Sequence, residues 1–174
     1  FETVKPPYDF NYWEIVRPST EKTGGDIRFR KGMICQSAEN PIECSLDFYR
    51  TDDSLTETIE EVINNDMPFY IRTNQRNYNR FWLGSDELKK FIGVVDSKGD
   101  ALLIAAAAGF FFETNDSYMS GIRQTRSGYE IIALKTISEC KPLLINQYLL
   151  KVDQNGNMEA EAEKVFIDEA KTCE

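Results

Sequence analysis

The stretch from residue 148 to residue 156 reads Tyr-Leu-Leu-Lys-Val-Asp-Gln-Asn-Gly and carries the clearest structural signal in the chain. Residues 148–152 are rich in the apolar, β-branched and aromatic side chains that favour a strand. Asn155-Gly156 is the dipeptide that most strongly favours a two-residue hairpin turn, because both central positions of such a turn need a positive φ. We therefore predict a β-hairpin near the end of the chain, with its last strand at residues 165–168.

Short strand-like runs separated by turn residues extend over the rest of the chain. Strands are predicted at residues 12–16, 26–30, 45–50, 68–73, 91–95, 101–104, 110–113 and 129–134, with a hairpin turn at 97–100. Helical periodicity is scarce: residues 54–63 suit a helix or a strand equally, and residues 159–164 suit one helical turn. Many short strands without a linker predict an all-β chain, a closed barrel or sandwich, forming a single domain over residues 1–174.

The composition of the chain excludes several classes of function. The 174 residues include 20 Lys plus Arg and 29 Asp plus Glu, a formal net charge of −9, and no His. Nucleic-acid affinity rests on an excess of Lys and Arg, so a nucleic-acid partner is not expected. Without His, neither Ser-His-Asp nor Cys-His catalysis nor a His-ligated zinc site can form. The hydrophobic share of 41% is enough for a packed core.

The four cysteines, Cys35, Cys44, Cys140 and Cys173, point to an oxidising compartment. Their number is even and no close pair resembles a zinc motif, so we predict two disulfides and no metal site, with three connectivities open. Cys35–Cys44 would close a short loop and Cys140–Cys173 would tie down the C-terminus, whereas four free thiols in a cytosolic protein are the alternative. The first residue is Phe rather than Met, which suggests a cleaved signal peptide and a secreted, extracellular or vacuolar protein. The longest apolar run, residues 101–112, is too short to cross a membrane.

Two polar constellations have simple structural interpretations. Arginines alternate with aromatic residues at Arg72, Arg76 and Arg80, a pattern found in some sites that bind single-stranded nucleic acid. The acidic net charge of the chain argues against such a site and favours arginines on the solvent-exposed face of one or two strands. The acidic residues cluster at 52–61 and 159–163, and we interpret both clusters as solvent-exposed surface. Residues 153–157 suit a hairpin turn better than a calcium-binding loop. No cofactor is predicted.

Several segments, in order, resemble the plant Kunitz-type (soybean trypsin inhibitor) family. Residues 109–113, Gly-Phe-Phe-Phe-Glu, resemble its Gly-Trp-Phe strand, residues 129–132 its Tyr-Lys-Leu-Val strand, and residues 148–156 the start of its closing hairpin. Residues 12–15 and 24–28 resemble its Tyr-Tyr-Ile and Gly-Gly-Ile segments. The family's opening Val-x-Asp-x-x-Gly pattern is absent, and the usual partners of Cys44 and Cys140 are missing. The resemblance implies a β-trefoil, a short barrel capped by hairpins.

The resemblance also implies a function, namely inhibition of a serine protease by an exposed loop. The matching segment is Pro68-Phe69-Tyr70-Ile71-Arg72, which resembles the family's Pro-Tyr-Arg-Ile-Arg. When the family's loop is matched residue by residue, the resemblance places the specificity side chain at Tyr70 and the targeted bond between Tyr70 and Ile71. It also places a residue that supports the loop at Asn11. A Tyr favours a chymotrypsin-like or subtilisin-like target, whereas a register slip of two would offer Arg72. The inhibitor would act as a monomer.

Four alternatives stay open at this point. Residues 68–72 also suit a half-buried strand instead of a loop. The same fold suits a non-inhibitory binding or storage protein with a carbohydrate or protein ligand. A glycosidase would need two carboxylates about 5–10 Å apart in a cleft, and a lipocalin-like barrel is the rival fold. The conformation of residues 66–74 distinguishes best between inhibition and the alternatives. An exposed, extended loop favours inhibition, and a paired central strand argues against it.

Overall fold

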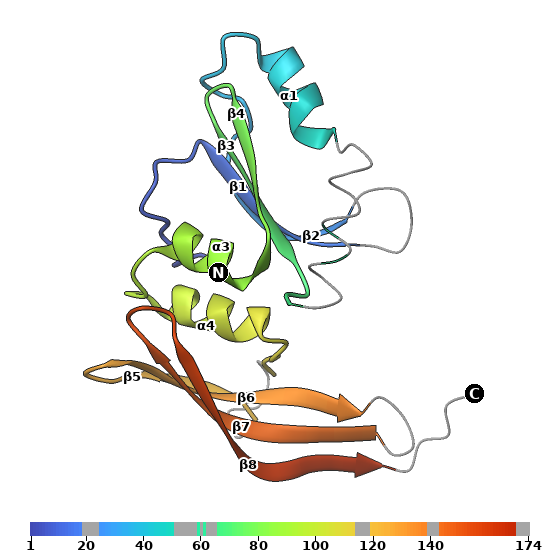
Figure 1. The fold of residues 1–174 in the computed structure, drawn as a ribbon, viewed down its shortest axis with the longest axis vertical. Helices are drawn as coiled ribbons and strands as arrows, with labels where there is room; N and C mark the ends of the chain where they lie inside the picture. Colours follow the sequence, from blue (N-terminus) through green and yellow to red (C-terminus); the bar gives the residue numbers. More distant parts are fainter. Residues whose placement is uncertain are drawn as a thin grey trace. The chain divides into compact units, whose positions relative to one another are not determined.

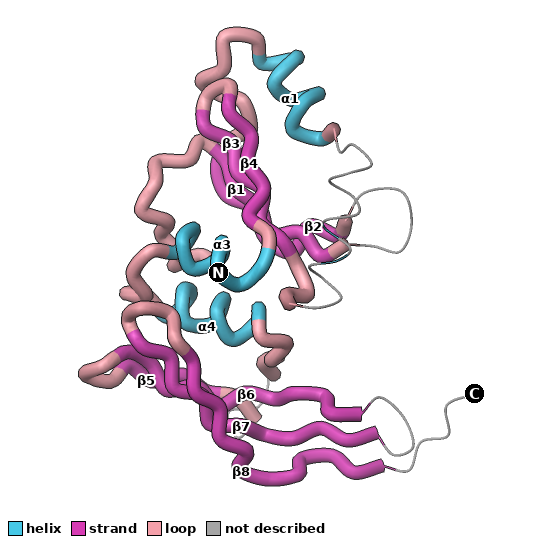
Figure 2. Tube along the Cα trace, in the orientation of Figure 1, coloured by secondary structure: helices cyan, strands magenta, loops and turns pink. Residues whose placement is uncertain are grey.

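The computed structural model describes residues 1–18, 25–50, 59, 61, 66–113, 119–138 and 143–169, the last four of these by their backbone alone. The chain divides into two compact units, which we call the first unit (Pro6–Gly93) and the second unit (Phe1–Lys5 with Val94–Glu174). Each unit contains one four-stranded antiparallel sheet (Figures 1 and 2). The chain is thus mostly β, as predicted. The trefoil is not confirmed, because the strands form two separate sheets, and the single domain stays a prediction.

The sheet of the first unit has the order β2-β1-β3-β4. Its strands are β1 (Tyr12–Arg17), β2 (Asp26–Gly32), β3 (Tyr70–Gln75) and β4 (Tyr78–Trp82). Helix α3 (Gly84–Ile92) packs on one face, where Phe91 contacts the rings of Trp13 and Trp82. Helix α1 (Pro41–Tyr49) lies over the opposite face, where Phe48 contacts Tyr12. Both faces of the central strands β1 and β3 are therefore covered.

The second unit consists of one helix and an antiparallel meander. Helix α4 (Lys98–Ala107) packs against β6 and β7 of the sheet β5 (Gly121–Gln124), β6 (Gly128–Ser138), β7 (Leu143–Asp153) and β8 (Met158–Glu169). The predicted hairpin between β7 and β8 is confirmed, but its two-residue turn is not. The Asp153 N–H donates to the Asn157 carbonyl at 3.0 Å, so residues 154–156 form the loop, and of Asn155 and Gly156 only Gly156 has a positive φ, 75°. Within the described part of the chain, no helix has the length and apolar character of a membrane span.

The predicted strand at residues 45–50 is wrong, because these residues belong to helix α1. The signals for the helix lie upstream of the apolar alternation. Asn40 is the N-cap, its Oδ1 accepts a hydrogen bond from the backbone N–H of Glu43 at 3.3 Å, and Pro41 occupies the first turn. Pro and an Asn cap are typical of a helix start, so the local capping chemistry overrides the alternation of Leu46 and Phe48.

The predicted turn at residues 97–100 and strand at 101–104 are also wrong, because they form the start of α4. The Ser97 hydroxyl accepts a hydrogen bond from the Asp100 N–H at 3.2 Å, and the Asp100 carboxylate accepts one from the Ser97 N–H at 3.0 Å. This reciprocal pair is a capping box, and the alanine-rich run that follows has the highest helix propensity.

Replacing Ser97 by Ala is expected to lower the free energy of unfolding by about 1 kcal/mol, because the N–H of Asp100 loses its acceptor. Chemical denaturation measures the change. Ser97→Asn is the matched control, since Asn also caps helices and adds no charge beside Asp96 and the buried Asp100, and it should stay within about 0.5 kcal/mol of the wild type. Equal destabilisation by both substitutions would show that the capping box does not stabilise α4.

The remaining predicted elements have mixed outcomes. The strand at 91–95 is wrong, since Phe91 and Ile92 end helix α3 and Gly93 follows with a φ of 72°. The helical turn at 159–164 is wrong, since these residues lie in β8. In place of the predicted strand at 110–113, the structure has a single antiparallel β-bridge between Phe111 and Leu134. The helix at 54–63 lies almost entirely outside the described residues, and β4 and β5 were not predicted.

Candidate binding surface

The segment predicted to be an inhibitory loop is not a loop. Tyr70, Ile71 and Arg72 lie in β3, which pairs with β1 on one side and with β4 on the other. All three side chains are buried, and Phe69 before them is buried as well. Pro68 precedes the strand and is only partly exposed. The prediction of an exposed loop at residues 68–72 is therefore wrong: a strand hydrogen-bonded on both edges has no free backbone to offer a protease.

Arg72 instead belongs to a buried ion pair. It faces Glu14 across β1 and β3, and its Nε donates to Glu14 Oε1 at 2.6 Å. The hydroxyl of Tyr12 donates to Glu14 Oε2 at 2.6 Å. Burial, reinforced by the Glu14 carboxylate, raises the pKa of Tyr12 well above its ordinary value. The aromatic rings of Phe48 and Tyr49 on α1 lie 5.1 and 5.4 Å from the Arg72 guanidinium carbon, so α1 covers this pair.

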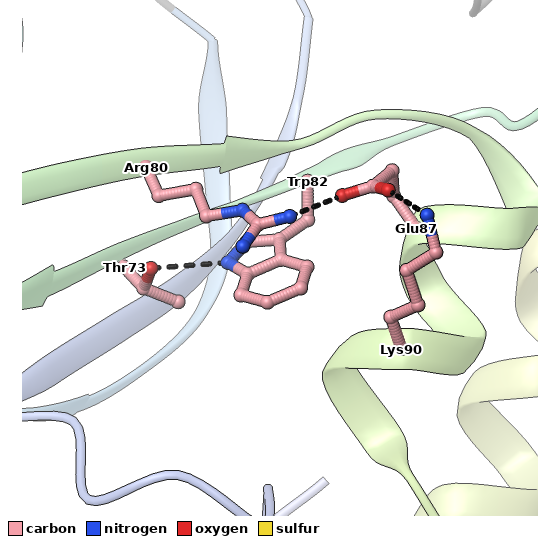
Figure 3. Close-up of polar contacts among 5 residues, drawn as sticks. All are labelled: Thr73, Arg80, Trp82, Glu87 and Lys90. Atoms are coloured by element: carbon pink, nitrogen blue, oxygen red, sulfur yellow. Dashed lines mark hydrogen bonds and ion pairs between the residues drawn. The ribbon is translucent and has the colours of Figure 1, made fainter.

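Arg80 is held in a second, half-exposed cluster (Figure 3). Its guanidinium lies 3.7 Å from the centre of the Trp82 ring and donates to Glu87 on α3 at 2.7 Å. Lys90 also donates to Glu87, at 2.5 Å, and hydrogen bonds from Lys90 and then Arg80 lower the pKa of that carboxyl. The indole N–H of Trp82 donates to Thr73 at 3.0 Å. Arg72 and Arg80 thus bind groups within the chain.

Asn11, predicted to support the inhibitory loop, supports a different turn. Its Oδ1 accepts a hydrogen bond from the Arg76 N–H at 2.8 Å. Arg76 lies in the turn between β3 and β4 and has a φ of 55°, which a residue other than Gly rarely adopts without support. The backbone of this turn is therefore fixed from the β1 side, but it is a tight turn and not an extended protease-ready segment.

A disulfide and a buried amide anchor helix α1 to this turn. Cys35 and Cys44 form a disulfide, which confirms one predicted bridge; Cys140 and Cys173 lie outside the described residues. The fully buried Asn74 accepts from the Cys35 N–H at 2.9 Å. Its amide donates to Arg76 O at 3.0 Å and lies 3.3 Å from Cys44 Sγ. The N-terminal half of α1, the disulfide and the β3–β4 turn are therefore one braced structure.

The outward face of α1 is apolar, which is unusual for a solvent-facing helix surface. Ile42, Leu46 and Tyr49 are 76%, 69% and 55% exposed. Their spacing, i, i+4 and i+7, places their backbone positions on one side of the helix, although the ring of Tyr49 turns back against the Arg72 guanidinium and is only partly part of the outward surface. Cys44 and Phe48 on the opposite side are buried. We call the three exposed residues the α1 stripe. The α1 stripe was not predicted from the sequence, because the helix that carries it was not predicted.

An acidic hollow lies beside the α1 stripe. It has a volume of about 220 Å³ and is lined by Glu39, Asn40, Glu43, Cys44, Asp47 and Asn77. Glu43 accepts a hydrogen bond from Asn40 Nδ2 at 3.1 Å. Among the described residues, no three His, Cys, Asp or Glu side chains are arranged to hold a metal ion. The hollow therefore offers negative charge and hydrogen-bond acceptors at the surface.

No family model matches the chain, and comparisons with curated proteins and with solved structures found no match either. The Kunitz-type resemblance accordingly stays a prediction. Among the described residues, the α1 stripe and its braced support form the most distinctive arrangement.

Proposed function

We propose that the protein is a non-catalytic binding protein that recognises a partner protein through the α1 stripe. The observation that supports this most is the exposure of Ile42, Leu46 and Tyr49 in register on one helix face. Single exposed apolar residues are common on protein surfaces, but a contiguous group marks an interaction surface far more often. This corresponds to the binding alternative among the sequence predictions, with protein as the ligand.

The braced support of α1 favours such a role. Because the disulfide, Asn74 and the covered Glu14–Arg72 pair fix the buried face of α1, the outward face is already ordered before a partner arrives. A preformed surface loses little conformational entropy on docking, so its contacts convert efficiently into affinity.

A peptide-display selection tests the proposal. Random peptides are selected on the wild-type protein alone, and the selected peptides are then measured on the double variant Ile42→Gln with Leu46→Gln, which keeps charge and helix propensity. The selected peptides should bind the double variant at least about tenfold more weakly, because burial of one Leu or Ile contributes about 1.5–3 kcal/mol and about 1.4 kcal/mol is tenfold. Val165→Gln, at an exposed position of β8, is the matched control and should bind normally. Peptides that bind both variants and the wild type equally would refute the proposal.

Protease inhibition remains a prediction that a separate panel can test. The tight, braced turn and the paired strand β3 give no support to substrate-like docking at Tyr70, and the β-trefoil is not carried into the proposal. Assays with chymotrypsin-like and subtilisin-like proteases at micromolar protein should show no inhibition that depends on Tyr70. The Cys35–Cys44 disulfide supports an oxidising compartment, and the monomeric state is retained as a prediction.

A further inference from the structure

We infer that the partner segment that docks on the α1 stripe is cationic and amphipathic, with Lys or Arg side chains beside its apolar ones. This inference rests on the proposed function and specifies its ligand. The observation behind this inference is that the carboxylates of Glu43 and Asp47 lie along one side of the α1 stripe.

The carboxylates are placed in register with the apolar side chains. Glu43 and Asp47 directly follow Ile42 and Leu46 in the sequence, so each lies about 100° further around the helix. Both are exposed, and with Glu39 they line the acidic hollow. A segment that covers Ile42 and Leu46 would therefore place its own flanking side chains against these carboxylates.

The same carboxylates have no cation opposite them within the described residues. The ion pairs there involve other acids, namely Asp26, Glu14, Glu87 and Glu130. Glu43 is hydrogen-bonded to the neutral amide of Asn40. Because Glu43 and Asp47 are like charges at i and i+4, they repel each other and destabilise the helix. Cations brought by a partner would relieve that repulsion.

Lys and Arg are the ligand groups that fit both parts of the surface. Their methylene stems cover apolar area while their charged ends reach water or a carboxylate. A metal cation fits less well, since the described residues offer no set of three suitable ligands. An acidic segment would meet like charge along the whole flank, which costs affinity and excludes it as a partner.

The test uses three synthetic peptides of about 14 residues, nearly four helical turns. They share one Leu face and carry Lys, Gln or Glu at all other positions, and binding is measured by fluorescence polarisation. We expect the Lys peptide to bind most tightly, the Gln peptide more weakly and the Glu peptide least. Between about 0.05 M and 0.5 M salt, the Lys peptide should lose affinity and the Gln peptide should not.

Two charge variants separate a local effect from the net charge of the whole protein. Glu43→Gln with Asp47→Asn should weaken the Lys peptide by about three- to tenfold and leave the Gln peptide unchanged. Glu161→Gln with Glu163→Gln on β8 changes the net charge equally and should have little effect. Equal affinity of the Lys and Gln peptides, or equal weakening by both pairs of substitutions, would overturn the inference while leaving the proposed function intact. If none of the three peptides loses affinity in the Ile42→Gln, Leu46→Gln variant, the proposed function itself fails.

Discussion

Replacing Glu14 by Ala is expected to lower the free energy of unfolding by about 3–5 kcal/mol, because the substitution leaves a buried guanidinium without its counterion. Glu14 is fully buried and Arg72 nearly so, and the hydroxyl of Tyr12 loses its acceptor as well. Chemical denaturation followed by tryptophan fluorescence gives the change. Arg72→Ala should have a similar cost, since it leaves the carboxylate unpaired.

Two controls show that burial, and not the loss of any ion pair, causes the effect. Glu87→Ala removes a carboxylate that binds Arg80 and Lys90 at the surface, and it should cost less than about 1 kcal/mol. That smaller contribution is present at neutral pH and is lost as the pH falls through the lowered pKa of Glu87. Replacing the buried network by apolar residues, with Glu14→Leu, Arg72→Met and Tyr12→Phe together, should restore most of the stability. Equal costs for Glu14→Ala and Glu87→Ala would contradict the assignment of a buried pair.

Replacing Cys35 and Cys44 together by Ser is expected to lower the free energy of unfolding by about 2–3 kcal/mol. The estimate follows from the entropy that a short closed loop removes from the unfolded chain. Because α1 is anchored at Cys44, the variant should also bind the Leu/Lys peptide several-fold more weakly, through loss of preorganisation. Denaturation and fluorescence polarisation measure the two effects. Lower stability with unchanged peptide affinity would show that the disulfide does not organise the α1 stripe.

The strands were predictable where apolar residues alternate or cluster between turn residues. The segments around Tyr12, Ile71 and Ile131 have this pattern, and all three lie in strands. The hairpin at Asn155-Gly156 was predictable because the dipeptide strongly favours a turn, whereas the length of the loop was not. The pairing of strands into two sheets was not, since it depends on contacts between segments far apart in the sequence.

The helices were missed for separate physical reasons. In α4 the run of Ala, Leu and Ile is apolar all round and has no helical period, so the signals that could have identified it are the Ser97–Asp100 capping box and the alanine content. In α1 the Asn40-Pro41 start was outweighed by a local alternation. Helix α3 does carry a readable period, with Leu88, Phe91 and Ile92 on its buried face.

The candidate site depended on these missed helices. The i, i+4, i+7 spacing of Ile42, Leu46 and Tyr49 has meaning only once residues 41–49 are known to be helical. The burial of Arg72 depends on its register opposite Glu14, which no local pattern reveals. The family resemblance placed a functional loop on residues that the sheet requires, and it assigned Asn11 to that loop, whereas Asn11 binds the turn at Arg76.

Chemical-shift mapping of the Leu/Lys peptide on the isotope-labelled protein tests the central claim most directly. If the α1 stripe is the binding surface, the largest shifts should occur in the amides of Ile42 to Tyr49 and in neighbouring Asn77, with little change in β5 to β8. The same titration of the Ile42→Gln, Leu46→Gln variant should lose these shifts. Shifts centred on the second unit, or a pattern unchanged in the variant, would contradict the account.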